Sequence, residues 1–169
     1  AGVSGEILWK PVNSRLGVGL ELSRVQQRDF DIRLGLQDYQ ATTGHLSAYY
    51  DFDSGFTAQL DAGQYLAEDV GYTLRLSRLF GNGWEMGAWA TITNVPFERF
   101  GEGSFDKGLF FRIPLDWSIG YPSSYVSNIA FSPLTRDGGA KLNPPFRLHG
   151  LTRFTQASAM TKEAGRFWK

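Results

Sequence analysis

Residues 46–62 read LSAYYDFDSGFTAQLDA, and this stretch decides the fold. Apolar side chains occupy every second position on both sides of the turn residues 53–55, and the positions between them are small or polar. The apolar positions are Leu46, Ala48, Tyr50, Phe52, Phe56, Ala58, Leu60 and Ala62. Because successive side chains of a strand point to opposite faces, the stretch predicts a β-hairpin with one apolar and one polar face.

The same alternation recurs along the chain and predicts about eight strands within residues 1–140, followed by a tail over 141–169. The expected strands cover 3–10, 16–22, 39–52, 56–65, 72–77, 84–93, 109–117 and 125–134. Short links are expected at Pro11, Ser54, Asn82 and Pro122, and longer, polar connections around Asp29, Glu68 and Glu102. Short and long connections therefore alternate.

Two all-β architectures produce this pattern, a soluble sandwich and an antiparallel transmembrane β-barrel, and they differ in what the apolar face contacts. Outer-membrane barrels combine short periplasmic turns with long outer loops and carry aromatic girdles at the water interface. Aromatic residues near expected strand ends are Trp9, Tyr50, Phe52, Phe56, Tyr72, Trp84 and Trp117. We therefore favour the barrel, while a sandwich core that is rich in aromatic residues remains the alternative.

The order of the connections adds an expectation about the whole protein. If the short links face the periplasm, the first strand begins on the outer side. A bacterial barrel normally begins and ends on the periplasmic side. We therefore expect further strands upstream of Ala1, so that the chain is the C-terminal portion of a larger barrel.

Composition removes several functional classes. The 169 residues include 17 basic and 17 acidic ones, so a net charge of zero gives no reason to expect nucleic acid as a partner. The absence of Cys excludes disulfides, thiolate metal sites and Cys nucleophiles. His45 and His149 lack metal-ligand spacing or a nucleophile motif, and each is interpreted as structural or solvent-facing. We expect no metal, no cofactor and no enzymatic activity; a paired role for Asp51 and Asp61 in glycoside chemistry is the minor alternative.

The polar face is the better functional candidate. If the apolar face meets lipid, mixed charges, amides and aromatic rings line the interior and offer weak, repeated contacts to a hydrated polymer. The candidate substrate-binding residues are Tyr49, Asp51, Gln59, Asp61, Tyr65, Arg75, Glu85, Trp89 and Arg112, with Glu21 on the same face. The competing interpretation is a small barrel filled by its own side chains.

The tail is basic and unlike a strand. Its apolar residues Leu148, Leu151 and Phe154 recur at every third position, which favours a helix that packs on the barrel mouth or lies on a membrane surface. A solvated terminus is an equal alternative.

Long composite motifs carry a family resemblance. FGEGSFDKG at 100–108, IPLDW at 113–117 and PLTRDGGA at 133–140 resemble the C-terminal region of the YjbH/GfcD family, and 1–11 and 44–51 are similar to it as well. The resemblance implies an outer-membrane β-barrel lipoprotein encoded with exopolysaccharide or capsule genes. It also implies outer-membrane lipid, polysaccharide and other envelope secretion components as partners, and it defines no catalytic residue.

The resemblance and the polar face together give the functional expectation. We expect a bacterial outer-membrane component of exopolysaccharide or capsule export that provides a polar path or docking site for the polymer. The alternatives are a non-conducting structural barrel that binds secretion proteins and, third, a soluble glycan-binding sandwich. In the outer loops, Arg99, Glu102, Asp106 and Lys107 are candidates for contact with glycan or a partner, or for salt bridges within the loop.

Overall fold

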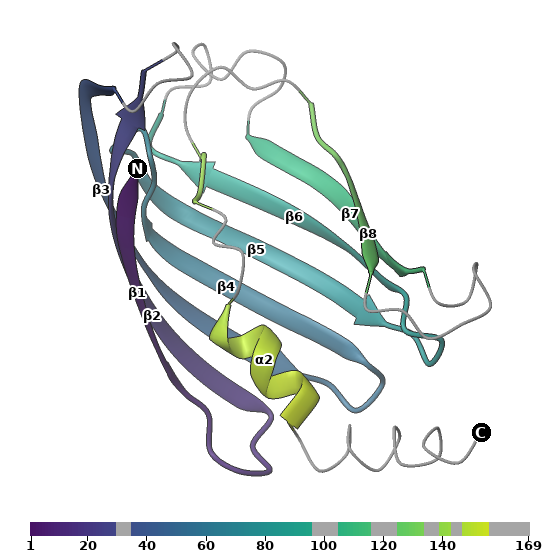
Figure 1. Ribbon diagram of the computed structural model, residues 1–169. Helices are drawn as coiled ribbons and strands as arrows, with labels where there is room; N and C mark the ends of the chain where they lie inside the picture. Colours follow the sequence, from purple (N-terminus) through teal and green to yellow (C-terminus); the bar gives the residue numbers. More distant parts are fainter. Residues whose placement is uncertain (30–34, 96–104, 116–124, 134–138, 143–146, 156–169) are drawn as a thin grey trace.

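The computed structural model describes residues 1–29, 35–95, 105–115, 125–133, 139–142 and 147–155 (Figure 1). Eight strands and one short helix account for most of them. The strands are β1 (Gly2–Trp9), β2 (Leu16–Arg28), β3 (Leu36–Asp51), β4 (Phe56–Gln64), β5 (Val70–Leu79), β6 (Glu85–Thr93), β7 (Asp106–Pro114) and β8 (Val126–Phe131), and the helix is α2 (Leu148–Thr155). The prediction of an all-β chain with eight strands and a helical segment in the tail is confirmed.

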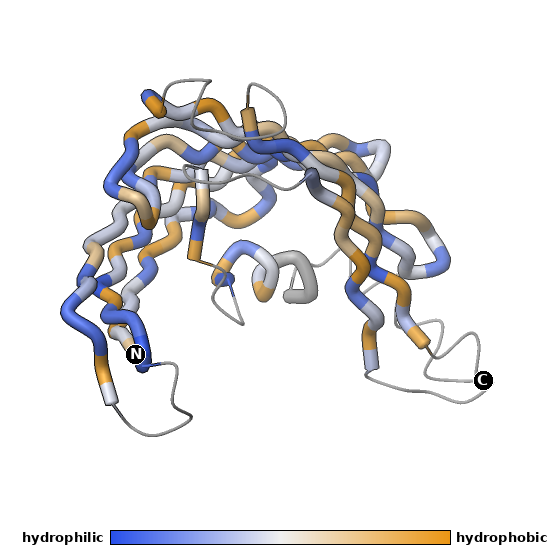
Figure 2. Tube along the Cα trace, turned by 90° about the horizontal axis from the view of Figure 1, so that it is seen from above, coloured by the Kyte–Doolittle hydropathy of each residue, from blue (hydrophilic) through white to orange (hydrophobic). Residues whose placement is uncertain are grey.

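The strands form one antiparallel sheet in which each strand pairs with its neighbours in sequence, from β1 to β8. The sheet bends into a deep trough, with β1 and β8 at its two margins (Figure 2). Within the described residues, β1 and β8 do not pair with each other, so these eight strands form an open trough and not a closed barrel.

Tight turns join the strands at one end of the trough. The backbone N–H of Gly55 donates to the Phe52 carbonyl at 3.2 Å, and that of Gly83 donates to the Phe80 carbonyl at 3.0 Å. Both glycines have positive φ, 82° and 87°, which residues with a Cβ rarely adopt. The turns expected at 53–55 and near Asn82 are therefore present, whereas Pro122 lies outside the described residues.

The two faces of the sheet have opposite polarity. On β3, Leu46 keeps 56% of its surface exposed on the convex face, while the next residue, Ser47, is 2% exposed on the concave face. Soluble proteins bury the apolar side chains and expose the polar ones. This sheet does the reverse, and the alternation of faces predicted from the sequence is confirmed.

The convex face is also zoned along the strands. Its middle is aliphatic, because Leu20 pairs with Leu46 and Leu60 with Leu74. Exposed aromatic side chains lie near the tight-turn end and include Trp9, Tyr50 and Phe52. Trp117 lies outside the described residues.

The β2–β3 hairpin is longer than the sequence analysis predicted. Pairing continues to Arg28 and Leu36 past a register irregularity, beyond the last apolar positions. Side-chain hydrogen bonds accompany this polar extension: Gln26 Nε2 donates to the Gln37 carbonyl at 2.9 Å, and Arg24 donates to Gln40 Oε1 at 3.2 Å. Apolar alternation ends where the convex face becomes polar, but the backbone ladder needs no apolar side chains.

The helical content of the described residues is small. The helix α2 has eight residues. None of the helices in the described part of the chain has the length and apolar character needed to cross a membrane.

Candidate functional site on the concave face

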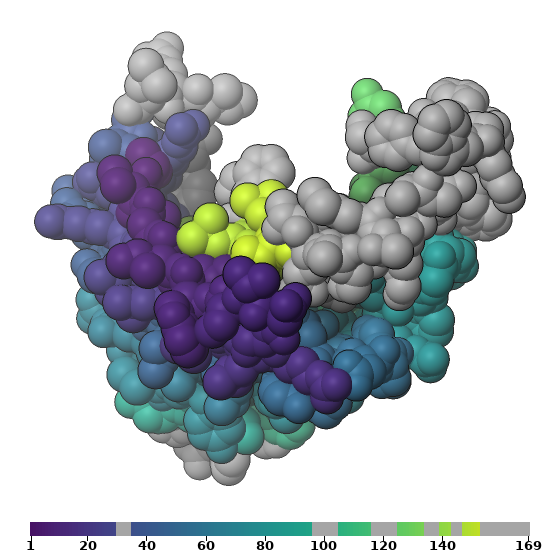
Figure 3. Space-filling model, turned by 90° about the horizontal axis from the view of Figure 1, so that it is seen from below, coloured from purple at the N-terminus to yellow at the C-terminus, as the bar shows by residue number. Residues whose placement is uncertain are grey.

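A segment from beyond β8 lies against the concave face. We call residues 139–142 and 147–155 the inner segment; Figure 2 shows it inside the trough, and Figure 3 shows α2 seated in the hollow of the sheet. Its first contacts are to the β4–β5 connection. The Gly139 N–H donates to Asp69 Oδ2 at 2.7 Å, and the Leu66 N–H donates to the Ala140 carbonyl at 3.0 Å.

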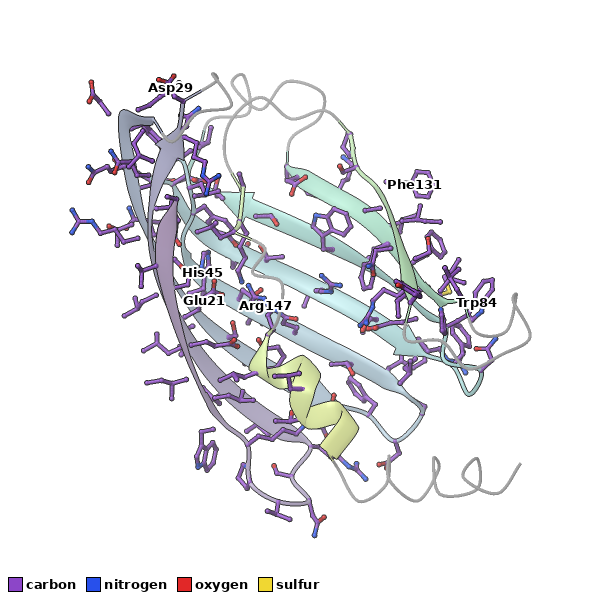
Figure 4. The ribbon with its side chains drawn as sticks, viewed as in Figure 1. Glu21, Asp29, His45, Trp84, Phe131 and Arg147 are labelled. Atoms are coloured by element: carbon purple, nitrogen blue, oxygen red, sulfur yellow. The ribbon has the colours of Figure 1, made fainter. Side chains whose placement is uncertain are left out.

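Two cations of the inner segment pair with carboxylates of the strands. Lys141 Nζ lies 2.7 Å from Asp61 Oδ2 on β4, and Arg147 Nη2 lies 2.8 Å from Glu21 Oε2 on β2 (Figure 4). The side chains of Asp61 and Glu21 are only 4% and 6% exposed. Both buried carboxylates therefore pair with a cation that is distant in the sequence. The two partners are 80 residues apart for Asp61 and Lys141 and 126 residues apart for Glu21 and Arg147.

The environments of the two cations differ. Burial lowers the pKa of the Lys141 ammonium, and the charge of Asp61 offsets only part of this effect. Burial also acts to lower the pKa of Arg147, but the negative charges of Glu21 and Asp61 act against it, and that pKa is raised overall. Burial therefore disfavours the charged form of Lys141, whereas the acidic neighbours of Arg147 favour its charged form.

The start of α2 makes a third set of contacts. The His149 ring stacks on Tyr49, with centroids 4.0 Å apart and planes 5° apart. His149 Nε2 also lies 3.6 Å from Asp51 Oδ2, and Lys10 forms an ion pair with the same carboxylate. The Leu148 N–H donates to Glu6 Oε2 at 3.0 Å. Tyr49 and Asp51, predicted to contact substrate, are thus covered by this chain's own residues.

These contacts correct the prediction for the tail. The tail was expected to form a helix on the barrel mouth or on a membrane surface, or to be a solvated, partly disordered terminus. Leu148 and Leu151 instead remain 37% and 50% exposed, and the ion pairs and the stacked ring hold the segment inside the trough. His149 is structural, as predicted, although it is buried and does not face solvent.

The concave face over β5, β6 and β7 has a different character. The Arg75 guanidinium lies over the Phe110 ring, 3.8 Å from its centroid. The Trp89 and Phe110 ring centroids are 6.4 Å apart, and Trp89 Nε1 donates to Asp106 Oδ2 at 3.3 Å. Aromatic rings and cations meet on this part of the trough, which we call the aromatic zone and define by Arg75, Trp89, Asp106 and Phe110.

Between these areas the polar face is densely hydrogen-bonded. The hydroxyls of Tyr65, Thr73 and Thr91 form a row with oxygen separations of 2.6 and 2.8 Å. Gln59 donates to both oxygens of Asp61, at 2.9 and 2.8 Å. His45 is 1% exposed and meets Tyr65 edge to face at 4.8 Å. In the described residues, no group of three or more His, Asp or Glu side chains could hold a metal ion.

All nine predicted inward-facing residues lie on the concave side, most of them as cross-strand neighbours. The register pairs Tyr49 with Gln59, Ser47 with Asp61, Gln59 with Arg75, Arg75 with Trp89, Glu85 with Arg112 and Asp51 with Thr57, and Tyr65 follows β4. Arg112 and Glu85 form an ion pair at 3.3 Å. Their contact with polysaccharide stays a prediction.

The predicted loop group is divided by the structure. Arg99 and Glu102 lie outside the described residues. Asp106 and Lys107 belong to β7 and not to a loop, because the strand begins earlier than its apolar positions do. Asp106 accepts the Trp89 hydrogen bond, and Lys107 lies over the Phe105 ring at 4.5 Å.

Four concave-face residues were not singled out as site residues by the sequence analysis. Lys10, Lys141 and Arg147 supply cations to strand carboxylates, and Phe110 holds Arg75. Phe110 had a detectable signal, since it places an aromatic ring at a polar position between Leu109 and Phe111. The basic character of the tail was the corresponding signal for Arg147.

Comparison with known proteins identifies the family. The family model described as "Exopolysaccharide biosynthesis protein YbjH" matches residues 1–154. The chain belongs to this YjbH family. This YjbH-family chain is also 39% identical over 156 residues to the "Uncharacterized lipoprotein YjbH" of Escherichia coli strain K12. The alignment covers 89% of the chain and 22% of that relative, so the chain spans about a fifth of the relative's length. No solved structure matches it.

The match includes the concave-face network. Residues 1–154 contain all eight strands of the YjbH-family chain and the inner segment as far as the last turn of α2. The family region therefore comprises both partners of each inner-segment ion pair. The predicted family membership is confirmed.

Proposed function

We propose that this chain is a section of an outer-membrane β-barrel that serves secretion or assembly of an exopolysaccharide. The observation that carries the proposal is the reversed polarity of the sheet, with an exposed aliphatic middle on the convex face and buried charges on the concave face. Lipid is the solvent that suits an exposed apolar band of this kind. The aromatic residues near the tight turns suit the interface with water.

A soluble sandwich fits the same sheet less well. It would need a second sheet packed on the apolar face at about 10 Å. The described strands all belong to one sheet, and the partly buried residues of the trough lie on the polar side. The convex face therefore has no protein cover in the described part of the chain.

The open margins bear on how the barrel closes. Unpaired backbone groups on lipid-exposed strand edges are costly, so spanning sheets close on themselves. We propose that strands from the rest of a longer protein pair with β1 and β8. The greater length of the Escherichia coli relative is in keeping with this. A barrel of more than eight strands would also leave space inside for a polymer.

The concave face would supply the functional surface of the barrel. Its carboxylates, hydroxyls, amides and rings offer many weak contacts to a hydrated polysaccharide, and no step in this role requires catalysis or a cofactor. Other envelope secretion components are the proposed protein partners.

Cell fractionation and deletion test this proposal. We expect the full-length protein in the outer-membrane fraction, with a folded form that migrates faster than the heat-denatured form in unboiled gels. Deletion of the gene should abolish surface exopolysaccharide, and plasmid expression should restore it. Unchanged polymer export in the deletion strain would contradict the role in secretion, and recovery in the soluble fraction without detergent would contradict the barrel.

A non-conducting structural barrel is the second candidate. The inner segment favours it, because its ion pairs and hydrogen bond attach it to the concave face at β1, β2 and β4. In planar lipid bilayers this candidate predicts no ion conductance by the full-length protein, together with stable capture of partner secretion proteins. Stable conductance that polysaccharide blocks would favour the path over the structural barrel.

A further inference from the structure

Arg75 differs from the other cations on the concave face. Lys10, Arg112, Lys141 and Arg147 each lie within 4.0 Å of a carboxylate oxygen. In the described part of the chain, no carboxylate oxygen forms an ion pair with the Arg75 guanidinium within 4.0 Å; Glu85, whose charge also acts on Arg75, pairs with Arg112. The guanidinium instead lies over the Phe110 ring, 3.8 Å from its centroid.

The contact with Phe110 positions the guanidinium. Phe110 is 6% exposed, so its ring is a buried platform, and stacking on a ring leaves the N–H donors at the guanidinium edge available. Five N–H donors in a planar fork match the two oxygens of a carboxylate. The edge of the Arg75 guanidinium therefore offers N–H donors to an anion that lies in its plane.

Trp89 adds an apolar surface beside the cation. It is the cross-strand neighbour of Arg75, and its Nε1 is held by Asp106 at 3.3 Å. A fixed indole ring offers a face to the C–H side of a pyranose, while Asp106 offers carboxylate oxygens that can accept from sugar hydroxyls. A planar cation next to a fixed aromatic ring suits a sugar that carries a carboxylate.

We propose that the aromatic zone is a subsite for an acidic sugar residue of the exported polymer, a hexuronate whose carboxylate binds Arg75 and whose ring packs on Trp89. The subsite rests on the proposed function and specifies its substrate class. It takes one sugar residue at a time, with weak affinity, because a polymer that moves along the trough must also leave each contact.

Binding measurements on the full-length protein in detergent test the subsite. The probe is trigalacturonate, and the matched ligand is the same trimer with its carboxyl groups reduced to alcohols. We expect binding of the acidic trimer and at least about tenfold weaker binding of the reduced one, since hydrogen bonds to charged groups contribute about 1.5–3 kcal/mol. Arg75→Gln should weaken acidic-trimer binding by about 10- to 100-fold, and Arg75→Lys by less, because it keeps the charge but loses the fork.

Arg78→Gln is the matched control. Arg78 lies on the same strand and also stacks on aromatic rings, Phe56 at 5.0 Å and Phe80 at 4.9 Å, but it belongs to the opposite face of the sheet. It should bind the acidic trimer like the wild type. The heat-dependent gel shift of each variant checks that it is folded.

The outcomes separate the subsite from the proposed function. Equal binding of both trimers, or acidic-trimer binding that survives Arg75→Gln in a folded variant, would overturn the acidic-sugar subsite. If neither trimer binds but deletion of the gene still abolishes surface polymer, the subsite is overturned and the export role stands. Normal export in the deletion strain would overturn the export role whatever the trimers do.

Discussion

Two Arg–carboxylate pairs in this chain differ chiefly in burial. Arg147 pairs with Glu21 inside the trough, where the side chains are 22% and 6% exposed, whereas Arg15 pairs with Asp53 at 55% and 77% exposure. Exposed pairs contribute about 0–1 kcal/mol, and removal of one partner from a buried pair costs about 3–5 kcal/mol. The inner segment therefore depends on the buried pair.

Glu21→Gln tests this dependence. We expect a loss of about 3 kcal/mol in the free energy of unfolding, because Arg147 would remain buried without a countercharge. Urea unfolding of the full-length protein in lipid vesicles measures it. Arg15→Gln is the control and should change the same quantity by less than about 1 kcal/mol. The double variant Glu21→Gln/Arg147→Gln should recover part of the loss, and strictly additive effects would speak against a direct pair.

Gly63 on β4 leaves no room for a side chain. A Cβ built there would lie 1.9 Å from the Gly44 carbonyl oxygen on β3, a contact that only a backbone shift could relieve. Gly63→Ala should therefore lower the yield of folded protein several-fold, as measured by the heat-dependent gel shift. Gly5→Ala on β1 is the control, because its Cβ would meet nothing within 4 Å. Equal yields of folded protein from the two variants would show that folding does not require a glycine beside the Gly44 carbonyl.

The sequence was enough to predict on which face of the sheet a side chain lies, but not which distant residue it contacts. Alternation alone was enough to place Tyr49 and Asp61 on the polar face. It could not predict that His149 stacks on Tyr49 or that Lys141 pairs with Asp61. These partners are 100 and 80 residues apart, and no local sequence pattern links residues at such separations. Long-range pairing depends on the curvature of the sheet, which single-strand periodicity does not encode.

At the level of elements, β3 combines two zones in one strand. Leu46 lies in the aliphatic middle of the convex face, while Leu36 lies in the polar extension of the β2–β3 hairpin. The ten residue steps from Leu36 to Leu46 correspond to about 33 Å along the strand. The apolar band of a membrane barrel is about 25 Å tall and is crossed by tilted strands. With Leu46 near its middle, such a band would not extend to Leu36.

Lysine substitutions at these two positions test the membrane assignment. Leu46→Lys should cost about 2–4 kcal/mol at the bilayer midplane and remove most of the protein from the outer-membrane fraction. Leu36→Lys should cost about 0–1 kcal/mol and leave the fractionation unchanged. Both leucines are about half exposed, at 56% and 49%, so a soluble sheet would tolerate the two changes equally.

Strand number and turn positions were predictable, and strand ends were less so. Asp53-Ser54-Gly55 and Gly81-Asn82-Gly83 carry the local turn chemistry, and both turns formed where expected. The C-terminal end of β2 and the start of β7 were placed incorrectly because the backbone ladder continues where apolar alternation stops. Polar stretches such as 24–28 are therefore predicted as loops from the sequence, although they belong to strands.

For the whole molecule, the concave face has an area covered by the inner segment and the aromatic zone beside it. If the chain lines a path, the covered area limits its width. Lys141→Gln/Arg147→Gln should weaken the attachment of the inner segment and increase the conductance of the full-length protein in planar bilayers several-fold. Arg15→Gln, which removes an exposed pair, should leave conductance unchanged. No change in either variant would argue that the inner segment does not limit the path.

The pairing of Glu21 and Asp61 with residues downstream of β8 also has a consequence for the order of folding. Contacts across such long sequence separations form late, because loop-closure entropy opposes them until the intervening strands are in place. Until the inner segment has docked, Glu21 and Asp61 therefore lack their cationic partners. Docking of the inner segment then neutralises these two carboxylates after the strands that carry them have paired.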